Sequence, residues 1–275
     1  MPKTSRDSSQ SVPLFVPDRL AISVAAAVLI AASISWVASY HLMHLMSSSD
    51  MMVSGVAAIV SSFSFSSVGF FEFVWIIGMM AMMFPAMIPM VLFYDKVKAK
   101  LESSPKLAQF AGTPIFLGGY LVTYALLGVG AYLAVYGAIA LSTVFPFLAV
   151  LSIIAPGAIL IATGCYQLSS LKSKCQSQCI SPFGFFAAHS DRGLFGAFRM
   201  GFRHGVFCVG CCWAYMLVML AVGAMSIPVM AALAAVIALE KVIVRGSVWF
   251  NRFVAIGFVL LGIFVGLFPT TLYLM

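Results

Sequence analysis

The sequence predicts an all-α protein that crosses a membrane as a polytopic bundle of about seven helices. Hydrophobic residues make up 63% of its 275 residues and charged residues only 8%, whereas about 25% is usual for soluble proteins. Its apolar runs are continuous and reach the roughly 20 residues that a helix needs to cross the hydrocarbon layer. A β-barrel would instead alternate apolar and polar residues over segments of about 10. We therefore expect a multi-pass protein of the cell membrane.

Seven apolar runs are the predicted spans: residues 20–46, 73–94, 114–141, 147–168, 205–224, 227–244 and 253–274. The first run exceeds the roughly 7 to 15 residues of a signal-peptide core, so it is expected to remain as an anchor. Residues 1–17 are polar and proline-containing and are expected to form a disordered cytoplasmic tail. Residues 18–275 are expected to form a single transmembrane domain.

The basic residues predict the orientation. If the N-terminus is cytoplasmic, all 15 Lys and Arg residues fall before the first span, or at the inner ends of the second, fourth and sixth spans and in the connections that follow them. Basic residues favour the inner side of membranes. The prediction is an inside N-terminus and an outside C-terminus. This pattern also accounts for the net charge of +7, so nucleic-acid binding is not expected.

The segment RHGVFCVGCCW, residues 203–213, is the densest group of metal-ligand residues. If a helix begins near Arg203, spacings of four, three and one put the histidine and the cysteines on one face. The same face continues to two methionines. The row of donors is His204, Cys208, Cys211, Cys212, Met216 and Met219. Thiolate, thioether and imidazole ligands at the cytoplasmic mouth of the fifth span suit a soft ion such as Cu(I).

The cytoplasmic loop 169–204 contains a second cysteine pair, Cys175 and Cys179, four residues apart in KCQSQC. These thiols would share one face of a helix and lie at the same membrane surface as the first cluster. They are candidates for completing its ligand set. A disulfide is the alternative, but the reducing cytoplasm disfavours it.

Methionines are concentrated in the second span, WIIGMMAMMFPAMIPM. They are Met79, Met80, Met82, Met83, Met87 and Met90. Methionines at helical spacing usually serve packing, but their density here favours a thioether-lined ion path. Pro85 and Pro89 remove backbone donors and are expected to kink this helix.

Two further features admit two interpretations each. His41 and His44 stand near Met43, Met46, Met51 and Met52 on the outer side, either as copper ligands or as residues that lie at the membrane surface. Glu240, next to Lys241, is either half of an intramembrane ion pair with Lys241 or Arg245, or a metal ligand or proton acceptor for the cysteines.

Four motifs together resemble a known family. WIIGMMAMMFPAMIPM, YQLSSLKSKCQSQC followed by SPFGF, RMGFRHGVFCVGCCW and MAALAAVIALEK occur in order over roughly residues 72–245. They are similar to a prokaryotic family of metal-binding integral membrane proteins that includes a proposed copper chaperone for a bacterial polyphenol oxidase. The resemblance implies copper handling. The motif positions it implies are Met79, Met80, Met82, Met83, Cys175, Cys179, His204, Cys208, Cys211, Cys212 and Glu240.

The leading hypothesis is a non-enzymatic membrane chaperone that binds Cu(I) and passes it to a copper-dependent enzyme or membrane complex. One alternative is a membrane thiol–disulfide oxidoreductase that uses the Cys208 and Cys211 pair. Another is a structural subunit of a larger complex, in which the cysteines hold a stabilising zinc ion.

Overall fold

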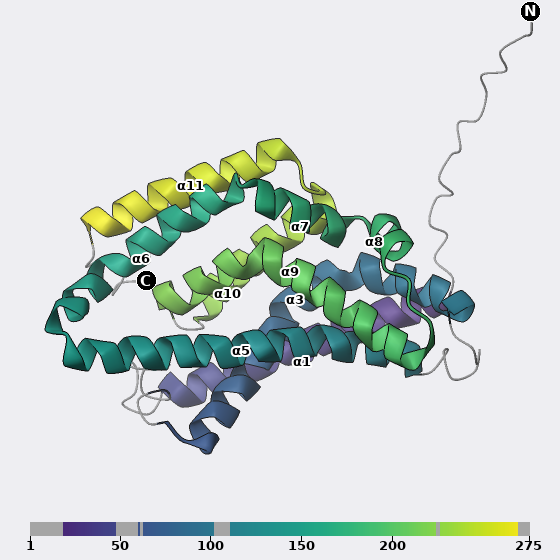
Figure 1. Ribbon diagram of the computed structural model, residues 1–275, viewed down its shortest axis with the longest axis horizontal. Coiled ribbons are helices and arrows are strands. Elements are labelled where there is room, and N and C mark those ends of the chain that lie inside the picture. Colours follow the sequence, from purple (N-terminus) through teal and green to yellow (C-terminus); the bar gives the residue numbers. More distant parts are fainter. Residues whose placement is uncertain (1–18, 48–59, 61–62, 102–110, 224–225, 269–275) are drawn as a thin grey trace, which may run out of the picture.

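Helices are the only secondary structure in the part of the chain that the computed structural model describes, residues 19–47, 60, 63–101, 111–223 and 226–268 (Figure 1). The predicted tail, residues 1–17, lies outside this part. The helices are α1 (Arg19–Ser47), α3 (Phe65–Leu101), α5 (Thr113–Val144), α6 (Pro146–Gln167), α7 (Ser170–Ile180), α8 (Pro182–Ala188), α9 (Gly193–Gly223), α10 (Ile227–Ala238), the π-helix η2 (Leu239–Ile243) and α11 (Val248–Leu267).

Five of these helices are long and apolar enough to cross a membrane, namely α1, α3, α5, α9 and α11. A sixth span results if α6 and α7, which meet at a bend of 67°, cross together. The predicted sixth run, residues 227–244, forms α10 and η2, which have 12 and 5 residues. The fold is therefore a multi-pass helical bundle, with five or six spans by length among the described residues. The seventh crossing and the orientation remain predictions.

The long connection after the fourth predicted span is helical, and the expectation that a helix begins near Arg203 was wrong. Helix α9 begins at Gly193, and residues 170–188 form α7 and α8. The first turns of α9 are stabilised by α5, because the two backbones approach closely at Gly119 and Gly201. A Cβ atom at Gly119 would collide with the backbone of Phe198, and one at Gly201 with that of Phe116. Small residues allow such contacts between membrane helices.

Serine caps determine where α7 and α8 begin. The Ser169 hydroxyl accepts a hydrogen bond from the Lys172 backbone N–H at 3.1 Å. The Ser181 hydroxyl accepts one from the Gly184 N–H at 3.2 Å, and Pro182 follows in the first turn of α8. Side-chain acceptors of this kind satisfy helix N-termini. The chain therefore leaves α6, turns, and lays α7 against α9 (Figure 1).

The core is aromatic and sulfur-rich, whereas the outer surface is apolar. Large side chains with almost no exposure come mostly from α3, α5 and α9: Trp75, Tyr94, Tyr120, Tyr124, Tyr132 and Tyr215. The Trp75 indole N–H donates to the Tyr124 carbonyl at 3.0 Å, so α3 and α5 are joined inside the bundle. Apolar side chains that face outward include Ile30, Ile34, Phe195, Phe253, Ile256 and Leu260. Such a surface suits lipid rather than water.

Candidate metal centre

Helix α9 carries three of the predicted cysteines in its central turns. Cys208, Cys211 and Cys212 are each no more than 3% exposed. Because the membrane-compatible part of α9 runs from Gly193 to Ala221, these thiols lie midway along the helix. They therefore lie well inside the helix rather than near its start, where the sequence placed them. Their location at the cytoplasmic mouth of a span stays a prediction.

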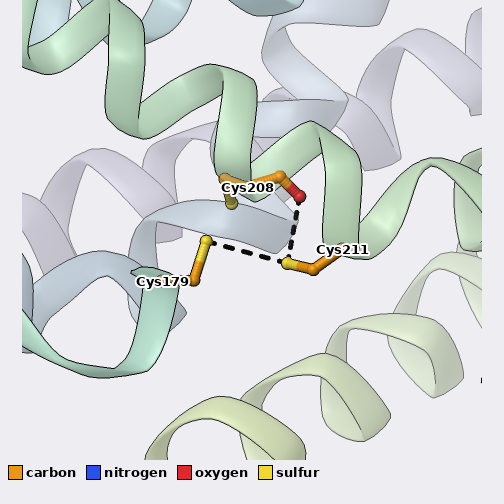
Figure 2. A group of neighbouring side chains, drawn as sticks. All are labelled: Cys179, Cys208 and Cys211. Carbon is orange, nitrogen blue, oxygen red and sulfur yellow. Dashed lines mark hydrogen bonds between the residues drawn. The ribbon is translucent and has the colours of Figure 1, made fainter. Parts of the chain in front are cut away.

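Cys179 from α7 joins two of these cysteines, and we call Cys179, Cys208 and Cys211 the thiol cluster (Figure 2). Their three Sγ atoms all lie within 4.8 Å of one another. The Cys211 Sγ lies 3.7 Å from that of Cys179 and 3.2 Å from the Cys208 carbonyl oxygen, which accepts its hydrogen bond. Cys212 is adjacent, with its Sγ 3.5 Å from that of Cys211. All six cysteines are free thiols.

A cation and two phenols surround the Cys208 sulfur. The Lys241 ammonium, which is 9% exposed, donates to Cys208 Sγ at 2.8 Å. The Tyr124 hydroxyl donates to the same sulfur at 3.2 Å, and the Tyr120 hydroxyl lies 3.2 Å from it and donates to Tyr124. Charge-assisted bonds of this kind stabilise a buried anionic sulfur. Sequence reasoning assigned none of these three residues to the cysteines.

Glu240 faces away from the thiol cluster. Its carboxylate forms a buried ion pair with Lys172 and accepts hydrogen bonds from Tyr215 at 2.9 Å and Gln176 at 2.6 Å. An ion pair inside the bundle was one of the two expectations for Glu240, but its partner is on α7 rather than being Lys241 or Arg245. Consecutive residues of a helix point in different directions. Lys241 therefore reaches the cysteines while Glu240 does not.

His204 lies one helical turn before Cys208 but outside the thiol cluster. Its ring is 2% exposed and stacks on Tyr120, with centroids 5.8 Å apart, and it meets Phe185 edge-on at 5.3 Å. Its Nδ1 atom has no hydrogen-bond partner among the described residues. An imidazole without a partner for this nitrogen keeps one atom free for a ligand or a proton.

Cys175 and Cys179 do share one side of α7, but only Cys179 enters the thiol cluster. Cys175 lies against the backbone of α9 at Gly210, where an added Cβ would be 2.7 Å from Cys175 Sγ. Cys165 on α6 is exposed. These two thiols differ from Cys179 in environment and serve as internal references for it.

The predicted methionines are buried in the same core as the cysteines. Five from α3 and two from α9 are at most 3% exposed: Met79, Met82, Met83, Met87, Met90, Met216 and Met219. Met80 is partly buried and packs against them. Helix α3 packs on α1, α5 and α10, so its methionines share the core with the thiol cluster without belonging to it. His41 and His44 are exposed at the end of α1, and their predicted neighbours Met51 and Met52 lie outside the described residues.

The sulfur atoms of the thiol cluster are suited to binding a soft cation. Three sulfur atoms from two helices converge where Cys208 and Cys211 are buried and Cys179 is partly buried, and a lysine ammonium lies beside Cys208. Soft thiolates select Cu(I) and zinc over hard cations such as magnesium or calcium, which require oxygen ligands. No carboxylate of the described residues joins the thiol cluster, and Glu240 is paired with Lys172 instead.

Comparison with known proteins identifies a family for this arrangement. The family model described as the copper chaperone PpoB2 matches residues 72–265, which include α5 to α10, η2 and nearly all of α3 and α11. No curated protein and no solved structure gives a significant match to the chain. The matched region covers well over half of the sequence and contains every cysteine. The chain therefore belongs to the PpoB2 copper chaperone family.

Proposed function

We propose that this protein binds Cu(I) at the thiol cluster inside the membrane and delivers the ion to a copper-dependent enzyme. The observation that carries the proposal is the convergence of Cys179, Cys208 and Cys211 within 4.8 Å in a chain of a copper chaperone family. Copper is the cargo. The protein supplies ligands and does no chemistry on the ion.

Three thiolates around a Cu(I) ion carry two negative charges in excess, which is unfavourable in a buried site. The Lys241 ammonium, 2.8 Å from Cys208 Sγ, offsets one of them. The Tyr124 hydroxyl withdraws further electron density from the same sulfur. Cys208 is then the weakest donor of the three, and it is the ligand that leaves when copper is released.

The buried methionines extend this proposal to a transfer path. Neutral thioethers bind Cu(I) without adding charge, and those of α3 and α9 share a continuous core with the thiol cluster. In this proposal they form weaker exchange sites. His204, with its unpartnered Nδ1 one turn from Cys208, is an auxiliary ligand.

Anaerobic copper loading of the detergent-purified protein tests the proposal. The native chain should retain one tightly bound Cu(I), and Cys208→Ser with Cys211→Ser should abolish it. Cys165→Ser is the matched control, because this thiol is exposed on α6 and outside the thiol cluster. Loaded protein should then activate a copper-free polyphenol oxidase faster than the double variant does. Equal copper retention by the native chain and the double variant would refute the proposal.

Disulfide trapping with a partner and zinc analysis of the copper-loaded protein separate the rival functions. A thiol oxidoreductase is favoured by the 3.7 Å between Cys211 and Cys179 sulfurs, and it would form a mixed disulfide with a partner through one of them. A structural zinc site would retain zinc in the presence of excess Cu(I). The copper proposal expects neither result under reducing conditions.

A further inference from the structure

A pocket of about 460 Å³ lies between α6, α7 and α11, separate from the thiol cluster. Two basic residues line it, Arg245 and Arg252, and no acidic residue is among its described lining residues. Neither guanidinium forms an ion pair with any carboxylate of the described chain: the pairs found there use other cations. The pocket therefore carries positive charge that the described carboxylates leave unbalanced.

A buried polar network lies behind the pocket and reaches its wall at Gln167, Gln176 and Asn251. Asn251 donates to Gln176 at 3.0 Å, and Gln176 in turn donates to Glu240 at 2.6 Å. Lys172 pairs with Glu240 and also donates to Gln167. Lys172 thus already neutralises the Glu240 charge. The hydrogen bond from Asn251 to Gln176 joins α11 to α7 beside the pocket.

Two polar atoms at the ends of this network have no partner. Gln167 Nε2 and Asn251 Oδ1 form no hydrogen bond among the described residues, although their residues are only 2% and 7% exposed. Both residues line the pocket. Buried polar atoms are normally satisfied. These two side chains therefore give the pocket wall hydrogen-bonding capacity that the described residues leave unused.

The backbone adds to the positive potential. Helix α11 has 20 residues, and its N-terminal turn, which includes Val248, borders the pocket. The first N–H groups of a helix have no partner within it and attract anions. Just before this helix, Arg245 has a φ of 48°, a left-handed conformation that is rare for residues other than glycine. The Gly246 N–H holds the turn by donating to the Glu240 carbonyl at 2.9 Å.

We propose that this pocket binds a phosphate ester anion, and that the ligand is the headgroup of an anionic phospholipid. The rim supports lipid as the source, since its lining residues Leu168 and Val248 are 61% and 64% exposed. These side chains would contact acyl chains while the arginines and the start of α11 bind the phosphate. Basic pockets between membrane helices bind lipid headgroups in this way. The inference does not depend on copper binding.

Native mass spectrometry of the full chain in detergent tests the site, with phosphatidylglycerol as the probe and phosphatidylcholine as the reference lipid. Arg245→Gln with Arg252→Gln should weaken phosphatidylglycerol binding about 10- to 30-fold, the effect of two basic residues near an anionic lipid. Lys174→Gln with Arg192→Gln is the matched control, because it removes the same charge from exposed residues that do not line the pocket. This control should bind phosphatidylglycerol like the native chain.

A second arm separates lipid from soluble phosphate. Inorganic phosphate is titrated calorimetrically into delipidated native protein and the same variants. Phosphate binding that depends on the two arginines, without retention of phosphatidylglycerol, would assign the site to a free phosphate and overturn the lipid assignment. Equal phosphatidylglycerol binding by the native chain and the arginine variant would overturn the site itself.

A third variant blocks the pocket without changing its charge, and two further measurements exclude misfolding. Ser177→Trp fills the pocket from an exposed position of α7 without changing charge, and it should also lose phosphatidylglycerol. Each variant must elute from size exclusion as the native chain does and keep its copper stoichiometry. A protein that does not bind phosphatidylglycerol here could still bind copper at the thiol cluster. A protein that does not bind copper could still bind phosphatidylglycerol here.

Discussion

The Cys208 sulfur is distinguished from the other thiols by what surrounds it. It receives hydrogen bonds from a buried ammonium and a buried phenol, whereas Cys211 is close to two other thiols and a carbonyl. An ammonium next to a thiol favours the thiolate, which is the form that binds metal. The cation also limits the excess negative charge of the loaded site.

Lys241→Met should therefore lower Cu(I) affinity about 10- to 100-fold, as expected for loss of a group that acts through a ligand. Competition with a Cu(I) chelator under anaerobic conditions measures the affinity. The matched control is Arg245→Met, an exposed cation four positions along the chain, which should leave the affinity unchanged. A native-like affinity in Lys241→Met would show that Cys208 needs no counter-charge.

The Glu240 and Lys172 pair has a structural role. Lys172→Met would leave a buried carboxylate without its cation, at a cost of about 3 to 5 kcal/mol in the free energy of unfolding. Removing both charges in Lys172→Met with Glu240→Leu should restore much of this loss. Thermal unfolding in detergent measures both. If the single variant is as stable as the native chain, the pair does not hold α7 against η2.

At the scale of helices, the contact between α5 and α9 determines the distance from the tyrosines to Cys208. Tyr120 and Tyr124 lie on α5, one turn apart, and Cys208 lies on α9. Close approach at Gly119 and Gly201 brings the two helices together. A side chain at either glycine would move the hydroxyls away from the sulfur.

Gly201→Ala should destabilise the protein by about 1 to 3 kcal/mol, because its methyl group would overlap the Phe116 backbone. Gly118→Ala is the control on α5, since no atom lies within 4 Å of the added carbon there. Thermal unfolding compares the two. The prediction fails if Gly201→Ala and Gly118→Ala unfold at the same temperature.

The apolar runs of the sequence predicted some helices closely, others in part, and the site in part. They predicted α1, α5 and α6 to within a few residues, because each is a continuous apolar run flanked by polar residues or proline. They missed the first turns of α9, whose stability comes from packing on α5. Spacing placed Cys208 and Cys211 on one face. It could not predict that Tyr124 meets Cys208, since that contact joins residues 84 positions apart.

The position of Lys241 next to Glu240 in the sequence already indicates that the two side chains have different partners. Adjacent residues of a helix diverge in direction, so a glutamate and a lysine in sequence cannot both face one partner. Read in that way, the pair Glu240 and Lys241 indicates two separate polar contacts. The structure contains both, one with Lys172 and one with Cys208.

For the whole molecule, the number of crossings determines the side on which the chain ends. With a cytoplasmic N-terminus, seven crossings put the C-terminus outside, and six return it to the cytoplasm. The deciding element is α10 with η2, which is short for a complete crossing. All basic residues fall on one side only if this element does cross.

Alkaline phosphatase fused after residue 275 should therefore be active, because this enzyme folds only outside the cytoplasm. A fluorescent protein fused at the same position should be dark when exported unfolded. Fusion after Lys106, in the connection that the basic residues predict to be cytoplasmic, provides the opposite reference. An inactive phosphatase and a bright fluorescent protein at the C-terminus would establish an even number of crossings.

The central claim is that thiols from two helices bind one Cu(I) ion, and X-ray absorption at the copper edge tests it most directly. The loaded native protein should show Cu(I) with a first shell of sulfur alone. Cys179→Ser should remove one sulfur scatterer, because this residue is the sole contribution of α7 to the thiol cluster, whereas Cys175→Ser should leave the spectrum unchanged. A first shell of nitrogen or oxygen in the native protein, or an unaltered spectrum in Cys179→Ser, would contradict the account.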